Sequence, residues 1–102
     1  MLTVDNETKE LGLLPFGKPF NFKYSLSNKG SEKVEVTKLV KGCGSCTKAS
    51  CDKTIIEPNG TANINVTFTP GSTGINKKTI QVLYKIGPLT HNMGLVFKAT
   101  VK

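Results

Sequence analysis

The chain has 102 residues, of which 37% are hydrophobic and 21% charged, a size and composition typical of one soluble globular domain. No apolar run approaches the roughly 18 residues of a membrane-spanning helix, and no basic segment followed by an apolar one opens the chain. We therefore expect a single domain over residues 1–102 with no signal peptide and no membrane insertion. Either the protein is not exported, or the domain is excised from a longer chain, or a leader has been removed.

The formal net charge is +7, from fourteen lysines and seven acidic residues, with no arginine. Proteins that read nucleic acids depend on the planar guanidinium of arginine, which contacts phosphate and guanine through two hydrogen bonds at once. The lysines are also spread along the chain rather than clustered. This pattern favours a solvated basic surface over a specific nucleic-acid site.

Short runs that alternate apolar and polar residues fill most of the chain, which is the pattern of β-strands with one buried face. The clearest run extends from Pro19 to Ser27. A slip of phase at residues 38–40 predicts a β-bulge. We expect strands at residues 10–14, 19–27, 33–40, 55–56, 62–68, 78–86 and 95–101. The aromatic residues that fall on inward phases are Phe20, Phe22, Tyr24, Phe68, Tyr84 and Phe97.

About seven short strands separated by turn residues predict an all-β fold, an immunoglobulin-like antiparallel β-sandwich. An antibody-type domain would pin its two sheets with a long-range cysteine pair beside a tryptophan. This chain has no tryptophan, and its three cysteines are close together in sequence. Leu83 and Val96 fall on outward phases, which is a weak indication of a partner surface.

The segment 41–53 carries the unusual chemistry, because it holds Cys43, Cys46 and Cys51 and no aliphatic side chain larger than alanine. We expect it to form a loop. One interpretation is a local disulfide, Cys46 with Cys51 or Cys43 with Cys51, which leaves one free thiol. Another is that all three are plain reduced thiols. Nearby lysines are expected to lower the thiol pKa values.

A metal site is the third interpretation of the cysteine segment. Cys43, Cys46 and Cys51 would supply three thiolates, and tetrahedral zinc needs a fourth ligand. The single histidine, His91, is the candidate for that position. The same histidine has no serine or carboxylate context that would indicate a catalytic triad.

The order of several motifs resembles bacterial immunoglobulin-like domains of unknown function that carry a Cys-Gly-Cys-Thr signature. Such domains are related in fold to the Hydin-type and major-sperm-protein-type sandwiches. The motifs are Leu11-Gly12, Phe16-Gly17, Phe20-Asn21-Phe22-Lys23-Tyr24, Asn28-Lys29-Gly30, Cys43-Gly44-Ser45-Cys46-Thr47, Ile56-Glu57-Pro58-Asn59-Gly60, Ile64-Asn65-Val66-Thr67-Phe68-Thr69-Pro70 and Lys78-Thr79-Ile80-Gln81-Val82. Here Ser45 separates the two signature cysteines and Cys51 is additional, so the role of the signature pair is not carried over.

The resemblance implies a non-enzymatic module for binding, assembly or display within a larger envelope, surface or multidomain protein, in an extracytoplasmic location. We therefore expect a structural or protein-interaction module whose partner is another protein or a neighbouring domain, with no cofactor and no small-molecule substrate. The alternative is a metal-binding module that holds zinc or copper through Cys43, Cys46, Cys51 and His91. A third hypothesis, based on charge, is a surface that recognises carbohydrate or a polyanion.

Overall fold

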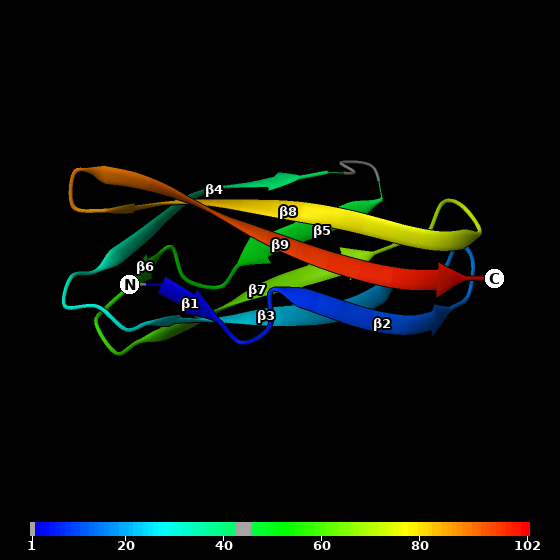
Figure 1. The fold of residues 1–102 in the computed structure, drawn as a ribbon, viewed down its shortest axis with the longest axis horizontal. Helices are drawn as coiled ribbons and strands as arrows, with labels where there is room; N and C mark the ends of the chain where they lie inside the picture. Colours follow the sequence, from blue (N-terminus) through cyan, green and yellow to red (C-terminus); the bar gives the residue numbers. More distant parts are fainter. Residues whose placement is uncertain (1, 43–45) are drawn as a thin grey trace.

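Two β-sheets face each other in the computed structural model, which describes residues 2–42 and 46–102 (Figure 1). One sheet has the strand order β1-β3-β7-β5, and the other has the order β2-β9-β8-β4-β6. The strands are β1 (Leu2–Val4), β2 (Thr8–Leu14), β3 (Phe20–Asn28), β4 (Val34–Lys41), β5 (Thr47–Cys51), β6 (Ile55–Ile56), β7 (Thr61–Phe68), β8 (Gly74–Ile86) and β9 (Leu89–Val101). The predicted immunoglobulin-like β-sandwich is confirmed, and the described residues contain no helix.

The described residues form nine strands where the sequence predicts about seven. β1 is one addition and β5 is the other, so the prediction of a loop is wrong for residues 47–51. β5 pairs with β7 throughout its length. Its inward side chains are small, and the apolar alternation is therefore too weak to show in the sequence. One pair, β2 with β9, is parallel, and all the other strand pairs are antiparallel.

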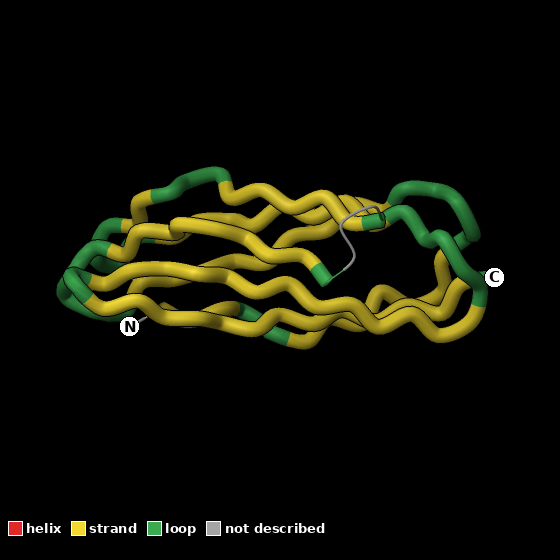
Figure 2. The backbone as a smooth tube through the Cα atoms, turned by 90° about the horizontal axis from the view of Figure 1, so that it is seen from above, coloured by secondary structure: helices red, strands yellow, loops and turns green. Residues whose placement is uncertain are grey.

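The molecule is elongated along the strands, with principal extents of 45 × 20 × 18 Å (Figure 2). β8 and β9 set this length, because each has 13 residues and they pair from one end of the sheet to the other. Gly87, with φ 58°, lies in the turn between them, where a left-handed backbone conformation favours glycine. The two strands extend several residues further than their apolar patterns predict.

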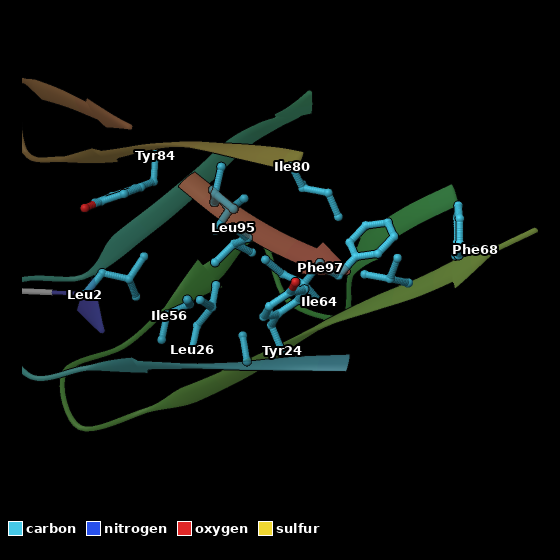
Figure 3. Close-up of a cluster of buried hydrophobic side chains, with 14 of the residues drawn as sticks. Leu2, Tyr24, Leu26, Ile56, Ile64, Phe68, Ile80, Tyr84, Leu95 and Phe97 are labelled. Carbon is cyan, nitrogen blue, oxygen red and sulfur yellow. The ribbon is translucent and has the colours of Figure 1, made fainter. Parts of the chain in front are cut away.

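Alternate side chains of the facing strands fill the space between the sheets (Figure 3). The inward phase predicted for six aromatic residues is confirmed, since four are buried and Phe20 and Phe22 pack partly buried against the core. The Phe97 ring lies 5.0 Å from the Phe22 ring and 5.1 Å from the Phe68 ring, both edge to face. Such edge-to-face pairs add to the burial energy.

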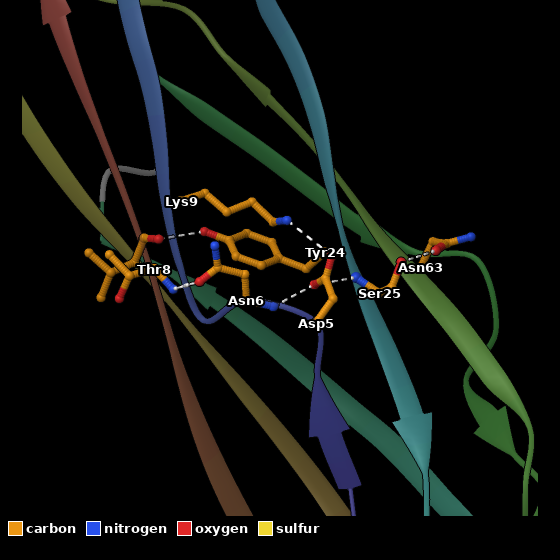
Figure 4. A network of polar contacts seen from close by, with 8 residues as sticks. Asp5, Asn6, Thr8, Lys9, Tyr24, Ser25 and Asn63 are labelled. Carbon is orange, nitrogen blue, oxygen red and sulfur yellow. Dashed lines mark hydrogen bonds and ion pairs between the residues drawn. The ribbon is translucent and has the colours of Figure 1, made fainter.

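Asp5 lies where the chain leaves β1 in one sheet and enters β2 in the other (Figure 4). Its carboxylate accepts hydrogen bonds from the Ser25 N–H at 3.0 Å and the Asn6 N–H at 2.9 Å, and it pairs with the Lys9 ammonium at 3.1 Å. Burial alone would raise the pKa of Asp5, but these donors outweigh burial and hold its pKa below the ordinary value. The carboxylate thus fixes the crossing between the sheets.

Two β-bulges change which side chains face outward. In β4 the register shifts between Val36 and Lys38, so the bulge predicted near the cysteine segment is confirmed and centred on Thr37. In β2 the register shifts between Glu10 and Leu13, and Gly12 there has φ 79°. Glycine adopts this left-handed conformation without the cost that a side chain would add. Beyond the second bulge Leu13 is exposed and Leu14 is buried.

Candidate functional site: the open side between β4 and β5

One long side of the sandwich is bordered by two strands, β4 and β5, whose outer edges have no partner among the described strands over most of their length. Among the described strands, β5 is the last of its sheet and pairs with β7 alone. In the other sheet, β6 covers the outer edge of β4 only at Val34 and Glu35. The described strands leave the rest of β4, from residue 37 to residue 41, uncovered on that side. An uncovered strand edge presents backbone N–H and C=O groups that another chain can pair with.

The hydrogen bonds at the strand ends show which backbone groups of β5 point away from β7. Cys46 C=O accepts from Thr69 N–H at 2.8 Å, and Asp52 N–H donates to Asn63 C=O at 2.9 Å. In an antiparallel pair, alternate residues exchange hydrogen bonds with the partner strand. The even-numbered residues of β5 therefore bond to β7, and the N–H and C=O groups of Thr47, Ala49 and Cys51 point toward the open side.

The same reasoning applies to β4. Gly42 N–H donates to Thr79 C=O at 2.8 Å, next to the Lys41–Ile80 pair of the ladder. By alternation, Val40 bonds to β8, and the backbone groups of Leu39 and Lys41 point away from it. Both sheets therefore present, to the same side of the molecule, backbone groups that no described strand pairs with.

A groove of about 280 Å³ lies between these two edges. Its apolar lining includes Leu39 from β4 and Ala49 and Cys51 from β5, which are partly buried against the core, and the buried Val36 adds to it. Its remaining lining residues are Thr37, Lys38 and Thr54. The groove thus combines a floor of small and medium-sized side chains with outward-pointing backbone groups on both borders.

Lysines flank the groove. Lys38 on β4 and Lys48 on β5 are both exposed. Lys53 follows β5, and its ammonium donates to Thr61 C=O at 3.3 Å. The nearby Asp52 carboxylate is occupied, because it accepts hydrogen bonds from both Asn63 nitrogens, at 2.8 and 3.3 Å. Lys38, Lys48 and Lys53 against the charge of Asp52 leave an excess of positive charge along the open side.

Cys51 is the free thiol of the two cysteines that the structure describes. Its Sγ–H donates to Lys53 C=O at 2.9 Å. Burial raises the pKa of the Cys51 thiol, the hydrogen bond to Lys53 opposes that shift, and the Asp52 charge adds to it. The expectation that the lysines lower this pKa is wrong, because burial is the largest contribution. Neither disulfide ring that includes Cys51 is formed here.

A match to a protein family spans nearly the whole of this sandwich. The model of a family described as "Protein of unknown function (DUF1573)" matches residues 2–101. The chain belongs to the DUF1573 family. No curated protein matches its sequence at a significant level.

Solved structures resemble the DUF1573 domain in fold at 10 to 15% sequence identity. The VesB protease of Vibrio cholerae gives a TM-score of 0.83 at 10% identity, over 97% of this chain and 31% of that one, so the domain spans about a third of its length. PapD-like domain 7 of human CEP192 gives 0.74 at 12% identity, over 99% and 84%. SSP-19 of Caenorhabditis elegans, described as like the MSP-domain family, gives 0.73 at 15% identity, over 96% and 98%.

His91 of the DUF1573 domain lies far from the start of the cysteine segment at Gly42. It pairs with Tyr84 across β8 and β9, five residues along β8 from the Thr79 that binds Gly42, or roughly 16 Å. Its ring stacks on the Tyr84 ring at 5.3 Å. The described residues contain no group of three or more histidine, cysteine, aspartate or glutamate side chains placed to hold a metal. Cys43 lies outside the described residues, so a metal held with its help stays a prediction.

Sequence reasoning missed the main features of this side of the DUF1573 domain. The cysteines mark the right segment, but the unpaired edges depend on which strands become neighbours. The exposed apolar residues also differ from the expectation, since Leu83 and Val96 are only partly exposed. The large apolar side chains that are most exposed are Leu13, Phe16, Val40, Ile55, Ile75 and Leu89.

Proposed function

We propose that the domain is a non-enzymatic protein-interaction module that binds an extended segment of another protein along its open side. One observation carries the proposal: two strand edges whose backbone groups pair with no other described strand border a single groove. An extended segment that adds to a free edge gains backbone hydrogen bonds, and pockets for its alternate side chains supply the specificity. Because the family has no established activity, the support comes from this geometry.

β5 is the edge that we assign to the partner segment. Thr47, Ala49 and Cys51 offer three consecutive outward-facing pairs of N–H and C=O groups without an intervening bulge. In a strand added to β5, every second side chain would face the groove and the others would face solvent beside Lys48. The proposed segment therefore alternates small apolar residues with acidic ones.

The lysines on both borders also disfavour pairing between two copies of the chain. In such a pair Lys48 of one copy would approach Lys48 or Lys38 of the other, and like charges opposed across strands destabilise the pairing. Lysine on an edge strand is a common protection against self-association. The same charges attract an acidic segment, so they select for a partner that differs from the chain itself.

We further propose that the module works in an envelope or surface assembly outside the cytoplasm. This placement is supported by the sequence resemblance alone. Immunodetection after fractionation of the source cells tests it, and recovery of the protein mainly in the cytosol would contradict it. The result would leave the binding mode untouched, because strand addition does not depend on the compartment.

Selection of peptides from a random displayed library tests the binding mode without a known partner. We expect the selected sequences to alternate acidic and small apolar residues. Titration of one selected peptide with the isolated domain then gives its affinity. In the complex, amide hydrogen exchange should slow at Thr47, Ala49 and Cys51, while Lys48 and Ser50 are already protected by β7 in the free protein.

Ala49→Pro is the decisive variant, because it removes the central outward N–H and leaves the hydrogen bonds to β7 in place. We expect it to weaken binding of the selected peptide at least about tenfold, which corresponds to the loss of one or two hydrogen bonds. Ala49→Ser is the matched control, since it keeps the N–H and nearly the same volume. Equal binding by Ala49→Pro, or protection of amides on another strand, would exclude strand addition at β5.

A further inference from the structure

Three large apolar side chains are exposed at one end of the sandwich, away from the open side. Leu13 is 59% exposed, Phe16 54% and Ile75 79%. We call these three residues the apolar end. β2 and β9 both finish here, beside the C-terminus (Figure 1). None of the three takes part in the core or in the groove between β4 and β5.

Strand register brings the members of the apolar end together. Leu13 on β2 and Ile75 on β8 both pair with Thr100 on β9, so Leu13, Thr100 and Ile75 form one row across the sheet. Phe16 lies just past the end of β2, where its N–H donates to the Lys102 C=O at 3.0 Å. Segments far apart in the sequence therefore contribute to one surface.

Lysines surround the apolar end. The next row across the same strands consists of Glu10, Lys98 and Lys77. Lys98 pairs with Glu10 at 3.8 Å, whereas Lys77 has no ion pair among the described residues. Lys102 lines the same hollow as Leu13, of about 320 Å³. These two rows and the chain end thus carry three lysines and one acidic residue.

We infer that the apolar end docks the domain onto an anionic lipid surface. Exposed apolar side chains enter the boundary between headgroups and acyl chains, and neighbouring lysines are attracted to anionic headgroups. Thr100 separates Leu13 from Ile75, so the side chains protrude singly and do not form the continuous apolar centre of a protein interface. A second copy of this chain is disfavoured, because the positive rims would repel each other.

The proposed contact is peripheral. No helix within the described residues is long and apolar enough to cross a membrane. It is also independent of the proposed function, since the residues of the apolar end and those of the open side do not overlap. A partner segment and a lipid surface can therefore be tested separately on the same protein.

Co-sedimentation with vesicles tests the inference. We expect the protein to sediment with vesicles of phosphatidylglycerol and phosphatidylcholine but not with phosphatidylcholine alone. The double variant Leu13→Ser with Ile75→Ser should bind at least about tenfold more weakly, since it removes two apolar contacts. Lys77→Ala should weaken binding about fivefold, the effect of one lysine near an anionic surface. Thermal unfolding of each variant checks that the fold is retained.

Leu89→Ser is the matched control, because Leu89 is 61% exposed and lies at the opposite end of β9. It should bind as the unaltered protein does. The chain has no tryptophan, so a tryptophan introduced as Ile75→Trp reports its own environment. Its emission should shift to shorter wavelength when anionic vesicles are added, and that of Leu89→Trp should not shift.

Three results would overturn the inference. Failure of the folded protein to bind anionic vesicles would assign the apolar end to a protein partner instead. If the double variant Leu13→Ser with Ile75→Ser bound anionic vesicles unchanged, the binding would come from the net charge of the protein and not from the apolar end. Equal weakening by Leu89→Ser would show that no particular end of the molecule meets the lipid.

Discussion

The hydroxyl of Tyr24 donates a 2.7 Å hydrogen bond to the backbone carbonyl of Val96, and this bond joins β3 of one sheet to β9 of the other. The Lys9 ammonium lies 5.1 Å from the centroid of the same ring, a distance that allows a cation–π interaction. Burial raises the pKa of Tyr24, and the Asp5 charge raises it further. The hydroxyl therefore keeps its proton, and Tyr24 connects both sheets to the crossing between β1 and β2.

Replacement of Tyr24 by phenylalanine should lower the free energy of unfolding by about 1 to 2 kcal/mol, because a partly buried hydrogen bond is lost while the ring still fills its place. Urea denaturation measures the change. Tyr84→Phe is the control, since the structure gives the Tyr84 hydroxyl no hydrogen bond to any described residue. A loss of the same size in both variants would mean that the bond between Tyr24 and Val96 does not hold the sheets together.

The Asp5 carboxylate predicts a pH dependence of stability. Its pKa is lowered in the folded protein, and that of an unfolded aspartate is about 3.9. Its contribution is therefore complete above the unfolded value and is lost as the pH falls through the lower folded value. Urea denaturation from neutral to acidic pH should show a shallower decline for Asp5→Asn than for the unaltered protein. Glu7→Gln removes an equal charge from a side chain that bonds to no described residue, and it serves as the control for the loss of charge alone.

The sequence predicts most of the core strands, because their large apolar residues alternate clearly with polar ones. Phe20 to Leu26 shows this directly, and its partner β7 shows it nearly as well. β5 escapes prediction because Ala49 and Cys51 are too small to mark an inward face. The exposure of Leu13 is not predicted either, because a single bulge at Gly12 reverses which of the following side chains face inward. Edges and bulges depend on tertiary pairing, and the two proposed surfaces are built from them.

Asn28 should be among the most sensitive polar positions. Its side chain is fully buried, and its amide donates to Glu32 C=O at 2.8 Å and Ile56 C=O at 2.9 Å. Asn28→Asp would place a carboxylate against both carbonyls, and we expect a loss of about 3 kcal/mol at neutral pH. The loss should shrink in acid, where protonation restores one donor.

Asn21→Asp is the control for the change at Asn28. Asn21 Oδ1 is exposed and accepts from the Thr67 hydroxyl at 2.7 Å, and a carboxylate can accept that bond equally well. We expect a change of less than about 0.5 kcal/mol. Urea denaturation of the two variants at neutral and acidic pH provides the comparison. A similar loss in both would show that added negative charge, and not the buried donor, accounts for the effect.

The three cysteines should give one free thiol and one disulfide in protein purified without reductant. Cys51 is free, so we predict that Cys43 pairs with Cys46. Iodoacetamide in denaturant should add one group before reduction and three after it, as read by intact mass. The ring is short, so we expect a contribution of only about 2 kcal/mol. A zinc or copper site would instead give three reactive thiols and one equivalent of metal by elemental analysis.

Proline substitution along β5 tests the alternation that defines the open side, without any partner. The Ala49 N–H points outward, so Ala49→Pro should cost only about 1 kcal/mol of stability. The Ser50 N–H points toward β7, so Ser50→Pro removes a ladder bond and should cost about 3 kcal/mol or more. Thermal and urea unfolding of the two neighbours give the difference directly. If Ala49→Pro were the more damaging, the N–H of Ala49 would have a partner within the chain and β5 would not be a free edge.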